Sequence, residues 1–93
     1  MKEIEIFYLT HCPYCKNARR AVEELCAENP AYASIRLNWI EESAHPELAE
    51  GRDYYYVPTL FFLGEKLYEA RPTHGYDVIK SHIREAFDRV LAD

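Results

Sequence analysis

The sequence is poor in features that mark several classes of protein. It has three cysteines in 93 residues, too few for the disulfide scaffold of a small secreted domain. Its longest apolar runs fall far short of the ~20 residues that a membrane-spanning helix needs. Glu3 and Glu5 interrupt the first apolar run and no cleavage-site pattern follows, so we expect no signal peptide and a cytoplasmic location.

The chain also lacks an excess of basic residues. It has 11 Lys and Arg against 16 Asp and Glu, a formal net charge of −5, with the two signs interspersed. Nucleic acids and anionic membranes attract basic patches, so neither is expected as a partner. A chain of 93 residues is long enough for one hydrophobic core and too short for two. We therefore expect one domain over residues 1–93, which acts as a monomer.

What the sequence does contain is a pair of cysteines at the expected start of a helix. In Cys12-Pro13-Tyr14-Cys15, Pro13 suits the first helical turn, because the N–H that it lacks would have no partner there. The N-terminus of a helix carries partial positive charge and unpaired N–H groups, which favour a thiolate over a thiol. A thiolate is the nucleophile of thiol–disulfide exchange. The motif therefore predicts redox chemistry, with Cys12 as the nucleophile and Cys15 as the resolving cysteine.

The hydrophobic pattern of the first half predicts two strands joined by a helix. The strands are expected at residues 3–9 and 34–40, and the helix from Pro13 to about Glu28. A strand, a helix and a strand in this order suggest a right-handed parallel βαβ unit. The apolar stripe expected along the helix consists of Ala18, Ala21, Val22, Leu25 and Cys26.

The second half predicts a hairpin between two helices. A short helix is expected near 44–50, then a strand over 54–63, a tight turn at Gly64-Glu65 and a return strand at 66–70. The last helix is expected over about 76–91. Its predicted buried residues are Val78, Ile79, Ile83, Ala86, Phe87 and Val90. The order β-α-β-α-β-β-α predicts an α/β fold with a four-stranded mixed sheet flanked by three helices.

Two motifs give the chain a resemblance to the glutaredoxins, within the thioredoxin-fold superfamily. Cys12-Pro13-Tyr14-Cys15 is identical to the active-site tetrapeptide common in dithiol glutaredoxins, and Val57-Pro58-Thr59 opens the third predicted strand. The order of the elements and the separation of the motifs fit as well, so the resemblance covers nearly the whole chain. It implies a thioredoxin fold in which the Val57–Pro58 bond is cis and Pro58 lies against the two cysteines.

The resemblance also implies a site for substrate or glutathione beside the cysteines. Tyr14 is expected to stack on the bound molecule, and Val57 is expected to offer its backbone to an extended substrate. Pro58 would occupy the space beside the sulfur atoms. Thr59, the third residue of the Val57-Pro58-Thr59 motif, is expected in the same binding site. Asp77 is the nearest match to the aspartate that holds the γ-glutamyl end of glutathione in that family.

Three departures from the family pattern concern glutathione. Leu9 stands where glutaredoxins usually have Lys or Arg, three residues before the first cysteine, and Tyr56 stands where they usually have Thr. The usual Gly-Gly before the last helix is replaced by His74-Gly75. Arg52 and Asp77 are then the remaining candidates to hold the charged groups of glutathione.

These observations predict a glutaredoxin-like thiol–disulfide oxidoreductase that reduces protein disulfides or glutathione mixed disulfides. No tightly bound cofactor is expected, and glutathione would take part as a co-substrate. One alternative is a thioredoxin-like protein that a flavoprotein reductase reduces without glutathione. Two others are a metal or iron–sulfur binding module and a non-catalytic redox adaptor. A structural zinc site needs four ligands, of which Cys12 and Cys15 supply two. No second pair is spaced to match, because His45, His74 and His82 are scattered singly.

Overall fold

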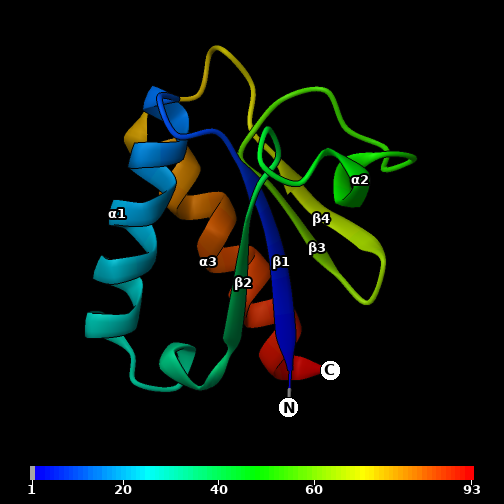
Figure 1. Cartoon of the computed structure of the whole chain (residues 1–93). Coiled ribbons are helices and arrows are strands. Elements are labelled where there is room, and N and C mark those ends of the chain that lie inside the picture. Colours follow the sequence, from blue (N-terminus) through cyan, green and yellow to red (C-terminus); the bar gives the residue numbers. More distant parts are fainter. Residues whose placement is uncertain (1) are drawn as a thin grey trace.

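The computed structural model describes residues 2–93, and its elements follow one another in the predicted order (Figure 1). A short 3-10 helix, η1, is the one addition to that order. The elements are β1 (Glu3–Tyr8), α1 (Pro13–Glu28), η1 (Tyr32–Ser34), β2 (Arg36–Glu41), α2 (Pro46–Ala49), β3 (Thr59–Phe62), β4 (Glu65–Glu69) and α3 (Tyr76–Ala92). No helix within residues 2–93 is long and apolar enough to cross a membrane.

The four strands form one mixed sheet in the order β2-β1-β3-β4, which confirms the predicted fold class. β1 runs parallel to β2, and β3 runs antiparallel to both β1 and β4. Parallel neighbours need a crossover connection, and α1 provides it. These directions bring the ends of β1, β2 and β4 and the beginning of β3 to one edge of the sheet (Figure 1). The loop that carries Cys12 and the segment before Thr59 therefore lie at the same edge.

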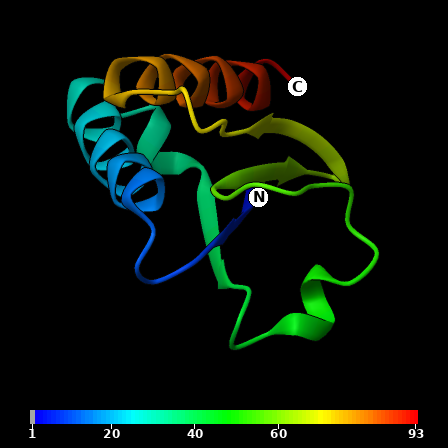
Figure 2. The same ribbon diagram turned by 90° about the horizontal axis from the view of Figure 1, so that it is seen from above.

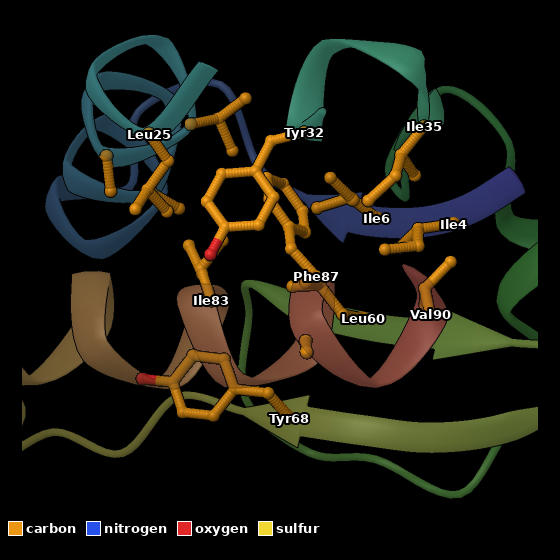
Figure 3. Close-up of a cluster of buried hydrophobic side chains, with 14 of the residues drawn as sticks. Ile4, Ile6, Leu25, Tyr32, Ile35, Leu60, Tyr68, Ile83, Phe87 and Val90 are labelled. Atoms are coloured by element: carbon orange, nitrogen blue, oxygen red, sulfur yellow. The ribbon is translucent and has the colours of Figure 1, made fainter. Parts of the chain in front are cut away.

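The main core lies between the sheet and the two long helices, α1 and α3, which cover the same face (Figures 2 and 3). Ile4 and Ile6 of β1 point into this core, and Phe87 of α3 packs against the ring of Tyr32 with 5.5 Å between ring centroids. The structure buries all members of the predicted α1 stripe except Cys26, which is half-buried; the buried members are Ala18, Ala21, Val22 and Leu25.

The prediction that α3 buries Val78 is wrong, because Val78 is 43% exposed. A helix turns by about 100° per residue, so Val78 lies well around the helix from its neighbour Ile79. The residues that face the core repeat every three or four positions from Ile79 onward. They are Ile79, Ile83, Ala86, Phe87 and Val90.

The opposite face of the sheet carries a smaller apolar cluster. Phe7, Ile40 and Phe61 are buried there, because side chains alternate between the two faces of a strand. Tyr54 covers this cluster, with its ring centroid 5.3 Å from that of Phe7. The short helix α2 adds Ala49 to the same cover. The expected helix over 44–50 is thus reduced to four residues, and Gly51 follows it with a φ of +81°.

The prediction of one long strand over 54–63 is wrong at both ends. β3 begins only at Thr59, because the backbone N–H groups of Tyr55 and Tyr56 donate to the carboxylate of Glu69 and not to a neighbouring strand. The strand ends at Phe62, since Leu63 has a φ of +51° and turns the chain into β4. The hairpin turn therefore lies one residue before the predicted position.

Candidate redox site

The nucleophilic position is built by the loop between β1 and α1. Cys12 is the N-cap residue of α1, with extended backbone angles, and Pro13 begins the helix. The Cys12 Sγ accepts the backbone N–H of Cys15 over 3.2 Å, so the sulfur takes the place of the oxygen that usually caps a helix. An N–H donor and the positive end of a sixteen-residue helix both stabilise negative charge on this sulfur.

The two cysteines differ in burial. Cys12 is partly exposed, whereas Cys15 is 4% exposed, and both are free thiols in this structure. Burial raises the pKa of the Cys15 thiol well above its usual range, and the adjacent Cys12 sulfur raises it further. The outer sulfur is therefore available to a substrate, while the inner one stays protonated beneath it.

The second predicted motif meets the first at Cys12. The Val57–Pro58 bond is cis, as expected, and Pro58 is buried. The Val57 carbonyl oxygen lies 3.7 Å from the Cys12 Sγ and accepts a hydrogen bond from the thiol. The Thr59 side chain is buried and its hydroxyl donates to the Tyr56 carbonyl, which ties the start of β3 to the segment before it. Of the predicted site residues, the structure thus brings Cys12, Cys15 and Val57-Pro58 together.

Tyr14 and Asp77 occupy different surroundings. The Tyr14 hydroxyl donates to the Pro72 carbonyl over 2.8 Å, so its ring lies between α1 and the loop that leads to α3. Asp77 is exposed in the first turn of α3. Arg52 does not belong to this site, because its guanidinium pairs with Glu5 at 2.9 Å over the rings of Phe7 and Phe61, on the opposite face of the sheet.

A carboxylate that the sequence analysis missed holds the Cys12 loop in place. Glu41 Oε2 accepts the N–H and the hydroxyl of Thr10, while Oε1 accepts the N–H and hydroxyl of Ser43 and the N–H of Ala44. The hydroxyls of Ser43 and Thr10 lower the pKa of Glu41 to about 2. Glu41 therefore links the loop before Cys12 to the turn after β2. No local sequence signal identifies this link, since Thr10 and Glu41 lie 31 residues apart.

A hollow of about 510 Å³ opens beside the nucleophile on this side. Its lining consists of Leu9, Thr10, His11, Cys12, Glu41 and Ser43. Neither Tyr14 nor Asp77 lines this hollow. Within residues 2–93, no group of three or more His, Cys, Asp and Glu side chains is placed to hold a metal ion.

The fold and the paired cysteines define a dithiol protein of the thioredoxin-fold superfamily. No family model matches the chain. The chain is 31% identical over 71 residues to a thioredoxin of Methanocaldococcus jannaschii, a match that covers 76% of this chain and 81% of that protein. The chain therefore belongs to the thioredoxin family.

Solved structures agree on the fold. The mitochondrial thioredoxin 3 of Saccharomyces cerevisiae, in its oxidised form, has a TM-score of 0.68 and 18% identity, with 95% of this chain and 77% of that chain covered. The thioredoxin of Fasciola hepatica has a TM-score of 0.67 and 21% identity, with 96% and 80% covered. These relatives are thioredoxins, so the predicted glutaredoxin-like subtype is not confirmed.

Proposed function

We propose that this protein is a thiol–disulfide oxidoreductase that reduces disulfides of polypeptides through Cys12 and Cys15. One observation carries the proposal: the partly exposed Cys12 sulfur accepts the Cys15 N–H at the start of α1, with the Cys15 thiol buried beside it. This geometry supports an anionic, accessible nucleophile and a protected second thiol. Membership of the thioredoxin family supports the same reaction.

The reaction proceeds in two exchanges. The Cys12 thiolate attacks one sulfur of the substrate disulfide, that S–S bond breaks, and the second substrate sulfur leaves as a thiolate. Burial and the Cys12 sulfur both raise the pKa of Cys15, so its thiol keeps its proton in the reduced protein. In the mixed disulfide the Cys12 sulfur carries no charge, which lowers this barrier, and the departing thiolate takes up the Cys15 proton. Cys15 then attacks the Cys12 sulfur and releases the first substrate sulfur, which takes up a proton from solvent. Two electrons pass to the substrate, and Cys12 and Cys15 form a disulfide.

We assign supporting roles to the second motif and its surroundings. Val57 presents its backbone to an extended substrate, and Pro58 fills the space beside the sulfurs. Thr59 fixes the Tyr56 carbonyl just before this segment. The function requires no tightly bound cofactor. Tyr14 and Asp77 remain candidates for contacts to substrate or glutathione at the start of the two long helices.

For the electron donor, we favour a flavoprotein reductase of the thioredoxin reductase kind over glutathione. Leu9 stands where a cation would hold a glutathione carboxylate, and Arg52 is paired with Glu5 elsewhere. Supplying the oxidised protein with each donor separately tests this choice. Turnover with glutathione and a glutathione-regenerating system, without turnover with the reductase, would reverse it.

Trapping the intermediate tests the two cysteine roles. Cys15→Ser is expected to accumulate a mixed disulfide between Cys12 and the substrate, because nothing resolves it, whereas Cys12→Ser forms none. Cys26→Ser is the matched control, since Cys26 lies on the same helix outside the motif and is expected to keep full activity. Non-reducing electrophoresis and mass spectrometry identify the adduct. If Cys12→Ser leaves the rate of disulfide reduction unchanged from that of the unmodified protein, Cys12 does not catalyse it, and the non-catalytic adaptor is favoured.

A further inference from the structure

Outside the cysteine pair, the structure contains a buried carboxylate with an unusual set of partners. The side chain of Glu69, at the end of β4, is 4% exposed. Its Oε2 accepts the backbone N–H of Tyr55 over 2.7 Å and that of Tyr56 over 2.8 Å, while its Oε1 accepts the Lys66 ammonium over 2.9 Å. A buried charge is costly unless it is paired and hydrogen-bonded, and here three donors meet that need.

These bonds fix the segment that reaches Cys12. Tyr55 and Tyr56 directly precede Val57, whose carbonyl oxygen is 3.7 Å from the Cys12 sulfur. On the far side of the cis bond, the Ala70 N–H donates to the Pro58 carbonyl over 3.0 Å. Glu69 and its neighbour Ala70 thus hold the segment both before and after Val57. Residues 54–58 belong to no helix or strand, so these bonds take over the role of a strand partner.

The same bonds hold two exposed aromatic residues in the segment that leads to Val57. The side chain of Tyr55 is 90% exposed and that of Tyr56 is 44% exposed, and the Arg71 guanidinium lies 5.6 Å from the centre of the Tyr56 ring. Exposed aromatic rings are typical of polypeptide-binding surfaces, because they offer large contact areas at small entropic cost. Tyr55 is two residues from Val57, so the two Cα atoms are at most about 7 Å apart, within reach of one extended peptide.

We propose that Glu69 is a positioning residue for a polypeptide-docking edge formed by Tyr55, Tyr56 and Val57. The occupant is the extended, disulfide-bearing segment of a substrate polypeptide, since this edge is continuous with the sulfur that reacts. The inference depends on the proposed function, because it assumes that Cys12 attacks the substrate disulfide. It adds that Glu69, because it holds this edge, determines how strongly the protein discriminates between polypeptide disulfides and small ones.

The test compares two substrates in single-turnover reactions of the pre-reduced protein. Oxidised insulin serves as the polypeptide disulfide and 2-hydroxyethyl disulfide as the small one, and acid quenching followed by thiol alkylation measures the progress of each reaction. In Glu69→Gln, the amide keeps the shape of the side chain but loses the charge and half of the acceptor capacity. We expect the second-order rate constant for insulin to fall by about tenfold, which is the size of effect that the loss of about one hydrogen bond implies. The fall should come from a higher half-saturating concentration of insulin. The rate with the small disulfide should change by less than about twofold.

The matched control is Glu65→Gln, which removes a 58% exposed carboxylate from the same strand and should leave both rates unchanged. If Glu69→Gln slows both substrates equally or changes neither, the inference is overturned. If the unmodified protein reduces neither substrate, the proposed function itself fails, which is a separate result.

A second variant keeps the test decisive if Glu69→Gln does not fold. Tyr55→Ala with Tyr56→Ala removes the exposed rings and leaves the backbone bonds to Glu69 in place. It should slow the reaction with insulin by a similar factor and spare the small disulfide. An unchanged rate with insulin in this double variant overturns the docking edge.

Discussion

Replacing Glu69 with Gln is also expected to remove a stabilising charge whose contribution depends on pH. Burial by itself would raise the pKa of this carboxyl, but the N–H groups of Tyr56 and Tyr55 and the Lys66 ammonium outweigh it and lower the pKa from 4.5 to about 2. The folded protein therefore binds the Glu69 proton more weakly than the unfolded chain does. Each pH unit between the two values corresponds to about 1.4 kcal/mol, which gives a contribution of about 3 kcal/mol at neutral pH.

The direction of the pH effect follows from the lowered pKa. The contribution is complete above the pKa of the unfolded chain, near 4.5, and is lost as the pH falls towards the folded-state value of about 2. Glu69→Gln cannot ionise at this position, so its stability lacks this component at every pH. The difference in unfolding free energy between the two proteins should thus be about 3 kcal/mol at pH 7 and should shrink towards zero near pH 2.

Urea denaturation of both reduced proteins at several pH values between 7 and 2.5 measures this difference. Glu41, Glu24 and Glu28 also have lowered pKa values, and they give both proteins a common loss of stability in acid. Subtracting one curve from the other cancels this common part. Two curves that stay parallel from pH 7 to 3 would refute the reasoning, because Glu69 would then bind its proton equally in the folded and unfolded states.

Two further predictions concern the Cys12 side of the site. Glu41→Gln leaves one acceptor oxygen for two groups of donors. The amide hydrogen of Thr10 should therefore exchange faster by roughly an order of magnitude, as measured by NMR, while that of Ile6 in β1 stays protected. Equal exchange rates at Thr10 in both proteins would contradict the role of Glu41. Iodoacetamide at pH 7 should modify Cys12 before Cys15, because Cys15 is 4% exposed and burial raises its pKa. Mass spectrometry of the quenched protein identifies the modified cysteine. Earlier labelling of Cys15 would contradict the assigned order of the two sulfurs.

The sequence alone was informative where local pattern determines structure. The period of α1 was readable from Ala18, Ala21, Val22 and Leu25, because a helix that packs on a sheet must bury one stripe. The position of Cys12 followed from Pro13, which marks the first turn of that helix. The cis bond at Pro58 came from the family resemblance and not from any local pattern.

The sequence was misleading where a distant side chain replaces a strand partner. Tyr54, Tyr55 and Tyr56 have strong β propensity, yet they lie outside β3 because Glu69, 13 and 14 residues further on, takes the N–H groups of two of them. Likewise, nothing in the sequence indicated that the Tyr14 hydroxyl donates to the Pro72 carbonyl, 58 residues away. Such bonds depend on which loops the sheet brings together, and spacing along the chain does not encode that.

The two carboxylates explain how irregular segments form a defined site. Backbone N–H groups at the edge of a sheet need acceptors, and neighbouring loops cannot supply a regular ladder of carbonyls. Glu41 collects the donors of the loop before Cys12, and Glu69 collects those of the segment before Val57. The two halves meet where the Val57 carbonyl lies 3.7 Å from the Cys12 sulfur. Since different side chains hold the nucleophile and the docking edge, a change at Glu41 should alter the reactivity of Cys12 with every disulfide, and a change at Glu69 should alter only the choice among them.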